Sequence, residues 1–270
     1  MATSGTIRTI WACRTGPRRG GAFSLVELLV VVGIIALLLA ILVPTLGRAK
    51  ELARRGTCAM NLKGLSQAVT IYGVENRTML PQFTTANNGA WLWDLSFAFG
   101  DAMLACGACR PMFYCPSGLY QDLDTHWWFT TGKRETATYT ISGYYWFHRR
   151  ALTGVAWGPT FLDPKTDPNG RRLLTHLQDQ LEVVTAANGT TFKTLGPSEL
   201  ELSSDATIST TVGTQEDFGY TKGASPVPHR TSHMDGKDPA GGNMMFLDGH
   251  VSWRTFSEMA KRAWTPNQWW

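Results

Sequence analysis

The feature that most constrains the fold is an almost wholly apolar run over residues 23–43, in which Glu27 is the only charged residue. As a helix rising about 1.5 Å per residue, this run would be about 31 Å long, which matches the hydrocarbon core of a bilayer. Residues 1–22 hold four Arg and no acidic residue. Although basic residues also follow the run, this first flank predicts a single-pass membrane helix with a cytoplasmic N-terminus and an extracytoplasmic C-terminal domain.

The length of this run and the presence of Glu27 argue against two simpler interpretations. A secretory signal has an apolar core of about 7–15 residues before a small-residue cleavage site, whereas this core is longer and residues 44–47 read PTLG. A plain membrane anchor fits the length but leaves the acid unexplained, because a carboxylate at mid-bilayer costs about 2.5–3.5 kcal/mol. Glu27 is therefore a candidate functional residue, with a glutamate snorkelling to the interface as the alternative.

Residues 22–31, AFSLVELLVV, resemble the cleavage signal of type IV prepilins and pseudopilins. In that family a peptidase cuts before a Phe, methylates the new N-terminus and leaves the apolar helix on the mature protein. Counted from Phe23, Glu27 is the fifth residue and Pro44 the twenty-second, the positions of the family's glutamate and helix-kinking proline. Ala22 stands where the family prefers Gly, a tolerated variant that leaves the rate of processing open.

The resemblance implies a processed subunit and its partners. Residues 1–22 would be the leader, with cleavage between Ala22 and Phe23 and methylation of Phe23. Glu27 would neutralise the N-terminal amine of a neighbouring subunit during assembly. The implied partners are the prepilin peptidase, other pilin-like subunits and the bacterial inner membrane, within a type II secretion or pilus-type system.

An amphipathic helix is expected after the membrane segment, within residues 44–81. Pro44 removes a backbone donor and is expected to bend the helix. Apolar residues recur at helical spacing from Leu62 to Tyr72. The opposite side is expected to carry the polar residues Arg48, Lys50, Glu51, Arg54, Arg55, Lys63 and Gln67. The segment from Cys58 to Tyr72 also resembles the helix of a large bacterial subgroup of pilin-like proteins.

Residues 82–270 show a different pattern of short strands, turns and aromatic residues. Residues 138–147 are rich in β-branched and aromatic side chains, which predicts a strand with a bulge at Gly143. The leucine spacing over residues 173–184 predicts a short amphipathic helix. With the long N-terminal helix, this pattern indicates an α+β extracytoplasmic domain, in agreement with the long helix packed on a small antiparallel sheet that the family resemblance implies.

The clearest local signal is a hairpin of residues 243–247 and 250–253 around Asp248-Gly249, a favoured two-residue turn. This turn predicts Phe246 opposite Val251 and Met244 opposite Trp253. Thereafter residues 255–258, TFSE, match a capping box that opens a short helix.

This hairpin resembles the C-terminal element of pilin-like proteins that carry an H-x9-DG motif. Asp248, Gly249 and His250 match its end, often continued as His-Val. The upstream candidate, His233, precedes Asp248 by fourteen intervening residues instead of nine, and an insertion over residues 235–239 would account for the difference.

Four cysteines remain after the leader, which contains Cys13: Cys58, Cys106, Cys109 and Cys115. An even number in an extracytoplasmic domain favours disulfides, in any of three connectivities. The spacing Cys106-x2-Cys109-x5-Cys115 would alternatively suit zinc with a histidine as the fourth ligand. A calcium or catalytic site is a further reading of the residues His233, Asp235, Asp238, Asp248 and His250, although Asp-Gly loops are common in turns.

These patterns favour a structural, non-enzymatic subunit that requires no cofactor. Calcium and zinc are the two metal ions whose binding the sequence leaves open. The chain lacks a basic run long enough for a nucleic-acid surface. The alternative is a membrane-tethered carbohydrate-binding module or hydrolase displayed with the same signal. Its candidate stacking residues are Trp91, Trp93, Trp127, Trp128, Trp269 and Trp270.

Overall fold

The computed structural model describes residues 24–81, 92–118, 123–128, 133–135, 139–147, 196–212, 214–221 and 230–259, together with strands at 181–185, 191–195, 261–263 and 267–269. The chain divides into two compact units, residues 1–47 and 48–270. The predicted leader, including Ala22, and the predicted first mature residue, Phe23, lie outside the described residues.

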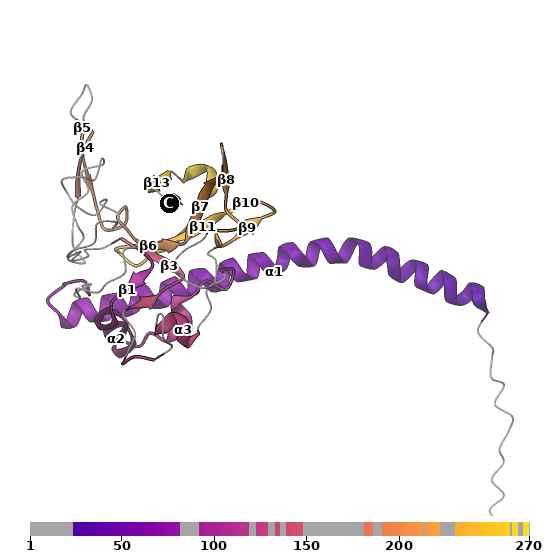
Figure 1. The fold of residues 1–270 in the computed structure, drawn as a ribbon, viewed down its shortest axis with the longest axis horizontal. Helices are drawn as coiled ribbons and strands as arrows, with labels where there is room; N and C mark the ends of the chain where they lie inside the picture. The colour runs from indigo at the N-terminus through magenta and orange to yellow at the C-terminus, as the bar shows by residue number, and fades with distance from the viewer. Residues whose placement is uncertain are drawn as a thin grey trace, which may run out of the picture. The chain divides into compact units, whose positions relative to one another are not determined.

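Helix α1 (Leu25–Glu75) runs without interruption through Pro44 (Figure 1). Its first part contains the apolar run and is long and apolar enough to cross a membrane, by length and composition. The side-chain hydroxyl of Thr45 donates to the carbonyls of Ile41 and Leu42, at 3.3 and 2.8 Å. This hydroxyl is an additional donor in the turn where proline lacks its N–H. The helix is therefore continuous through the proline at which the sequence predicted a bend.

The second part of α1 buries one stripe of side chains. Cys58, Leu62, Leu65 and Val69 are each at most 2% exposed, and Tyr72 packs partly buried against them. Their spacing of three and four residues keeps them on one side of the helix. The amphipathic pattern predicted from the sequence is thus confirmed for this segment.

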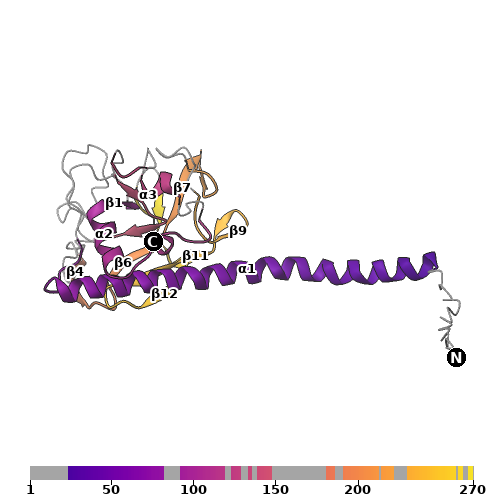
Figure 2. The ribbon, with the colours of Figure 1, turned by 90° about the horizontal axis from the view of Figure 1, so that it is seen from below.

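A four-stranded antiparallel sheet, ordered β12-β11-β6-β3, lies against this part of α1 (Figure 2). Its strands are β3 (Tyr144–Trp146), β6 (Glu201–Asp205), β11 (Gly241–Phe246) and β12 (Val251–Thr255). Contacts from helix to sheet include Lys63 Nζ and Ser66 Oγ, which donate to the carbonyl of Gly249 at 2.8 and 3.1 Å. The predicted α+β class, with a long helix on small antiparallel sheets, is confirmed.

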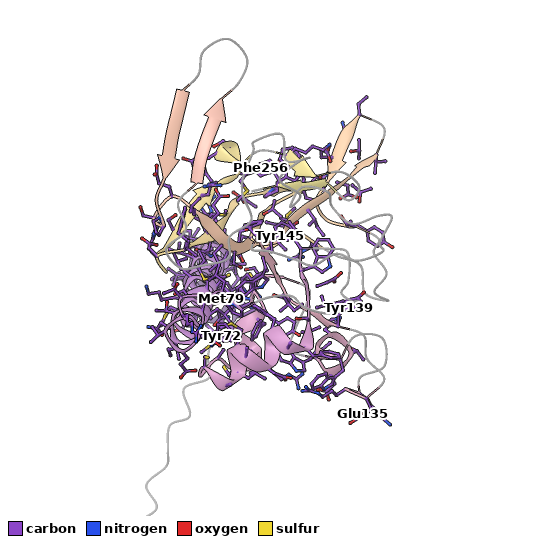
Figure 3. All side chains as sticks on the ribbon, turned by 90° about the vertical axis from the view of Figure 1, so that its left-hand side faces the viewer. Tyr72, Met79, Glu135, Tyr139, Tyr145 and Phe256 are labelled. Atoms are coloured by element: carbon purple, nitrogen blue, oxygen red, sulfur yellow. The ribbon has the colours of Figure 1, made fainter. Side chains whose placement is uncertain are left out.

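Aromatic side chains fill the core beside the sheet. Phe99 meets Trp146 with ring centroids 4.8 Å apart, and Phe113 meets Trp127 at 5.2 Å. Both pairs are edge-to-face, the arrangement that the quadrupole of the rings favours. These residues come from α2 (Phe97–Ala105), η1 (Arg110–Phe113), α3 (Asp124–Trp127) and β3. In Figure 3, Tyr145 of β3 lies in the interior while Glu135 lies at the edge.

The remaining described strands pair in further sheets, all antiparallel. The second four-stranded sheet has the order β13-β14-β7-β8. Its members are β7 (Thr207–Val212), β8 (Gln215–Asp217), β13 (Lys261–Ala263) and β14 (Asn267–Trp269). The part of the chain that the structure describes also contains three two-stranded pairs: β1 (Asp94–Leu95) with β2 (Thr140–Ile141), β4 (Leu181–Thr185) with β5 (Thr191–Leu195), and β9 (Met234–Asp235) with β10 (Asp238–Pro239).

The C-terminal hairpin is present as β11–β12, but its predicted register was wrong by one residue. Met245 lies opposite Val251 and Asn243 opposite Trp253. The connection is a three-residue loop, in which the N–H of Phe246 donates to the carbonyl of His250 and Gly249 has φ +85°. Strand β11 is a central strand that is buried on both faces. It therefore lacks the contrast between a buried apolar face and an exposed polar face that normally fixes the register of a strand.

Three other local predictions need correction. The predicted strand over residues 138–147 is split into β2 and β3, with Ser142 and Gly143 between them. The predicted helix over residues 173–184 is instead strand β4 from Leu181; its earlier residues lie outside the described part. The turn after Thr255 is only a three-residue 3-10 helix, η3 (Phe256–Glu258), although the predicted capping contact is made.

Candidate functional site

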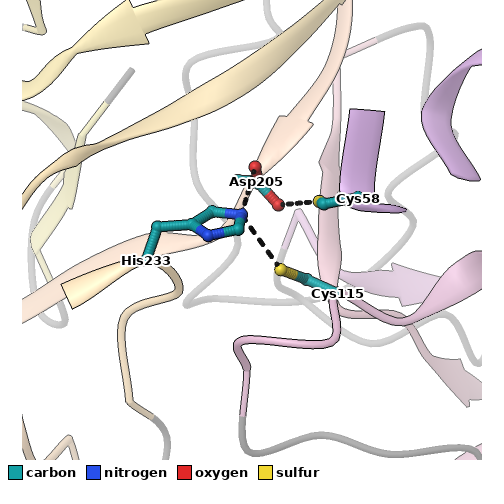
Figure 4. A group of neighbouring side chains, drawn as sticks. All are labelled: Cys58, Cys115, Asp205 and His233. Carbon is teal, nitrogen blue, oxygen red and sulfur yellow. Dashed lines mark hydrogen bonds and ion pairs between the residues drawn. The ribbon is translucent and has the colours of Figure 1, made fainter. Parts of the chain in front are cut away.

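Four side chains that are far apart in the sequence meet in the buried interior between α1 and the sheet: Cys58, Cys115, Asp205 and His233 (Figure 4). One sulfur, nitrogen or oxygen atom from each lies within 4.8 Å of the others. All four residues are at most 1% exposed. We call this set the Cys-Asp-His cluster.

Asp205 is the centre of the hydrogen bonds in the cluster. Its Oδ1 accepts from Cys58 Sγ at 2.8 Å, and its Oδ2 lies 3.2 Å from His233 Nε2. The backbone N–H and the side-chain amide of Asn243 both donate to Oδ2, at 2.7 and 3.0 Å. The aspartate ends β6, and the neighbouring Gly242 of β11 lets the two strands approach, since a Cβ there would lie 3.0 Å from Asp205 Cβ.

Cys115 reaches the cluster from a tight turn that follows η1. The N–H of Gly118 donates to the carbonyl of Cys115 at 2.9 Å. Gly143 packs against this turn so closely that a Cβ would lie 2.9 Å from the backbone nitrogen of Cys115. The break between β2 and β3 therefore places Gly143 in close contact with the backbone of Cys115. Cys115 Sγ lies 3.3 Å from His233 Nε2.

His233 uses both ring nitrogens and is held in an unusual backbone conformation. Its Nε2 faces Asp205 and Cys115, whereas its Nδ1 lies 2.7 Å from Glu51 Oε1. The residue has φ 54°, a left-handed conformation that costs energy for most residues other than Gly and that clusters at functional sites. Trp253 covers the ring edge-to-face at 5.4 Å.

Glu51 forms the outer layer of the cluster. Both of its carboxylate oxygens accept from the hydroxyl of Ser117 at 3.0 Å. Arg54 and Arg55 approach the same carboxylate at 3.8 Å, and Arg55 also stacks on the ring of Trp253 at 4.4 Å. The glutamate, predicted on the polar side of the helix, thus faces the domain.

The electrostatics of the cluster oppose the effect of burial. Burial alone would lower the pKa of His233, but hydrogen bonds and charges from Asp205 and Cys115 raise the pKa to about 11. Burial alone would raise the pKa of Asp205, but the bonds from His233, Cys58 and Asn243 hold the pKa below its ordinary value. For Cys58, burial raises the pKa of the thiol well above its ordinary value. These shifts favour an imidazolium at His233 beside the carboxylate of Asp205 at neutral pH.

The structure separates the cysteines and histidines that the sequence grouped. Cys58 and Cys115 enter the cluster, whereas Cys106 is buried elsewhere and Cys109 is exposed; all four are free thiols. His250 and Asp248 pair with each other at 2.6 Å in the hairpin loop, apart from His233. Asp235 and Asp238 pair across the exposed β9–β10 hairpin.

The β9–β10 hairpin lies between His233 and the Asp-Gly pair. It occupies the expected insertion and closes on itself, because the N–H of Ala240 donates to the carbonyl of His233 at 2.9 Å. Gly249, in turn, packs against α1, where a Cβ would lie 3.4 Å from Ser66 Oγ. The residues between His233 and Ala240 thus form a closed hairpin, and the loop at Gly249 contacts helix α1.

At the N-terminal end of α1, Glu27 forms a capping box with Ser24. The N–H of Ser24 donates to Glu27 Oε2 at 2.9 Å, and the N–H of Glu27 donates to Ser24 Oγ at 3.2 Å. The spacing Ser-x-x-Glu in the sequence signals this contact, which the sequence analysis did not include. Glu27 thus has a local partner within the single chain.

Two members of the buried site, Asp205 and Glu51, were not predicted as site residues. Glu51 lies seven residues before Cys58, two helical turns away on the same side, and this spacing was the available signal. For Asp205 no local signal is present. The described tryptophans among the proposed stacking residues are not open platforms, since Trp93 and Trp127 are buried and Trp128 and Trp269 are partly buried.

Comparison with known families gave one match, to the prokaryotic N-terminal methylation motif, over residues 17–43. Comparisons with curated proteins and with solved structures gave no match. The matched segment is about a tenth of the chain, and it contains Ala22, Phe23 and Glu27 at the predicted cleavage signal. Together with a long apolar helix followed by small antiparallel sheets, this motif supports a type IV pilin-like or pseudopilin-like protein that carries the prepilin-type processing signal.

Proposed function

We propose that this chain is a structural subunit of a pilin-like or pseudopilin assembly. The observation that carries the proposal is the methylation motif at residues 17–43, which overlaps the exposed apolar part of α1. The prepilin peptidase cuts between Ala22 and Phe23 and methylates Phe23. The apolar helix stays in the inner membrane, with its N-terminus cytoplasmic and the domain extracytoplasmic.

Assembly then proceeds through the apolar helix. Leu25 to Val43 present large apolar side chains that are 48–78% exposed in the single chain, which suits lateral packing of helices in lipid. Glu27 neutralises the new N-terminal amine of Phe23 on a neighbouring subunit. A buried pair of this kind fixes the register of the helices more than it adds net stability. The partners are other subunits with the same helix, in a type II secretion or pilus-type machine.

The hairpin loop supports membership of the H-x9-DG subgroup. The β9–β10 hairpin accounts for the additional residues between His233 and Asp248, since its ends are joined by the bond between Ala240 and His233. Lys63, Ser66 and Gly249 connect this element to the helix. In this proposal the motif has the structural role of connecting the hairpin loop to helix α1, and it has no catalytic role.

Mass spectrometry of the mature N-terminus tests processing. A chain that begins with methylated Phe23 is expected; an intact Met1, or a start beyond residue 46, would contradict the proposal. Assembly is tested by cross-linking of membranes that contain Glu27→Ala. We expect normal cleavage but loss of cross-linked multimers, with Glu75→Ala at the far end of the helix as the matched control. Multimers that persist in Glu27→Ala would count against assembly through this residue.

A further inference from the structure

The Cys-Asp-His cluster has the composition of a metal site. Glu51 lies behind His233, where metal sites often have a carboxylate that holds a histidine ligand. Thiolates, an imidazole and a carboxylate are the ligands of protein-bound zinc, whereas calcium and magnesium prefer oxygen ligands alone. Two sulfur atoms, one nitrogen and one carboxylate converge from four separate elements (Figure 4). We infer that Cys58, Cys115, Asp205 and His233 form a structural zinc site, which goes beyond the proposed function and does not depend on it.

The distances allow a tetrahedral ion if the ligand atoms shift by at most about 1 Å. Four ligand atoms about 2.0–2.3 Å from one zinc ion lie roughly 3.3–3.8 Å from one another. The closest contacts in the cluster are 2.8 Å from Cys58 Sγ to Asp205 Oδ1, 3.3 Å from Cys115 Sγ to His233 Nε2, and 3.2 Å from His233 Nε2 to Asp205 Oδ2. One ligand atom from each of the four residues lies within 4.8 Å of the other three. On binding, the closest pair would move apart by about 0.5–1 Å, and any pair as wide as this limit would close by about 1 Å.

The orientation of His233 gives an independent argument. A histidine that binds a metal through one nitrogen nearly always donates its other N–H to a carboxylate or carbonyl. His233 directs Nε2 into the cluster and places Nδ1 2.7 Å from the carboxylate of Glu51. Asn243 and Ser117 in turn hold the two carboxylates, at 2.7 and 3.0 Å. The second layer around the four ligands is thus already hydrogen-bonded.

Zinc binding to the cluster would release three protons and leave three negatively charged ligands around the ion. The ion displaces the protons of both thiols and the Nε2 proton of His233, which leave to solvent. Two thiolates and Asp205 then carry three negative charges around the dication, and the imidazole is neutral. With four protein ligands no coordination position is left open for substrate, which makes the site structural and not catalytic. The ion would connect α1, the turn after η1, the end of β6 and the residue before β9.

Metal analysis of the full chain in detergent, kept reduced, tests this inference. Elemental mass spectrometry is expected to find about one zinc ion per chain after gel filtration, as for a closed four-ligand site. Replacement by Co²⁺ is expected to give the thiolate charge-transfer absorption and the ligand-field bands of a tetrahedral ion. A reduced, folded chain that retains neither metal would overturn the inference, and so would a Cys58–Cys115 disulfide in the mature chain from zinc-replete cells.

Variants assign the ligands. Cys115→Ser is expected to lose the bound zinc, while Cys109→Ser, which removes an exposed thiol outside the cluster, is expected to keep it. If Cys115→Ser fails to fold, Glu51→Gln keeps the test open, since loss of a carboxylate behind a ligating histidine weakens metal affinity about 10–100-fold. Competition with a chromogenic chelator measures that change. Full zinc content in folded Cys115→Ser, or unchanged affinity in Glu51→Gln, would contradict the site as assigned.

Discussion

In the first part of helix α1, Leu38 leaves 62% of its surface exposed, whereas in the second part Leu62 is fully buried. Both are leucines in the same continuous helix, so helix propensity does not distinguish them. The first part is apolar on all sides, which suits lipid or neighbouring helices, while the second is apolar along one stripe that faces the domain. The comparison separates two uses of apolar surface: the second part packs on the domain, whereas the first stays exposed, as the proposed membrane insertion and assembly require.

The largest expected effect comes from truncating the same side chain in each part. Leu62→Ala removes buried atoms from the core and is expected to lower the free energy of unfolding of the domain by about 2–5 kcal/mol. Leu38→Ala is expected to change it by less than about 0.5 kcal/mol. Urea unfolding in detergent, followed by tryptophan fluorescence, measures both, because every tryptophan after the leader lies at or beyond residue 91. Equal losses in the two variants would break the comparison.

Both parts of α1 could be predicted from the sequence, in contrast to the register of the C-terminal hairpin. The apolar run and the stripe at Leu62 and Leu65 follow from local spacing, and both were predicted. The register of the β11–β12 hairpin was not, since Asp248-Gly249 suits a two-residue turn, whereas the bond from the N–H of Phe246 to the carbonyl of His250 closes a three-residue loop. Local spacing failed most where the chain is buried on all sides.

The buried cluster shows the same limit more sharply. Cys58 and Cys115 were named as disulfide or metal candidates, and His233 as a motif residue, but no local spacing connects them. Asp205 joins them only through the pairing of β6 with β11 and β3. A contact of that kind is fixed by tertiary structure, so the sequence could supply the chemistry of the site but not its members.

A second pair of variants, at glycines, is expected to change stability in opposite directions. Gly143→Ala places a methyl group 2.9 Å from the backbone nitrogen of Cys115 and is expected to destabilise the domain by about 1–3 kcal/mol. Gly56→Ala lies on α1 where an added Cβ meets nothing within 4 Å, and is expected to stabilise the helix by about 0.5–1 kcal/mol. The same urea titration compares them. A loss of stability in Gly56→Ala would show that this side of the helix is covered in the native protein.

The smallest effects are expected from the two capping boxes, one in each unit. Thr255 donates its hydroxyl and its N–H to Glu258 at 2.7 and 2.8 Å, so Thr255→Ala is expected to lower the stability of the domain by about 1 kcal/mol. Ser24→Ala removes the acceptor for the N–H of Glu27 and is expected to leave the unfolding of the domain unchanged. Urea unfolding again gives both values.

The Ser24→Ala variant also separates the two roles available to Glu27. If the carboxylate serves only to cap the helix within one chain, then Ser24→Ala and Glu27→Ala weaken the same local contact and should affect cross-linked multimers alike. If Glu27 instead pairs with the amine of a neighbouring Phe23, Ser24→Ala keeps the acid and multimers persist, whereas Glu27→Ala loses them. We expect the second result, because a local cap of an exposed helix end contributes only about 0.5–2 kcal/mol, whereas an amine left unpaired among apolar helices in lipid costs several kcal/mol.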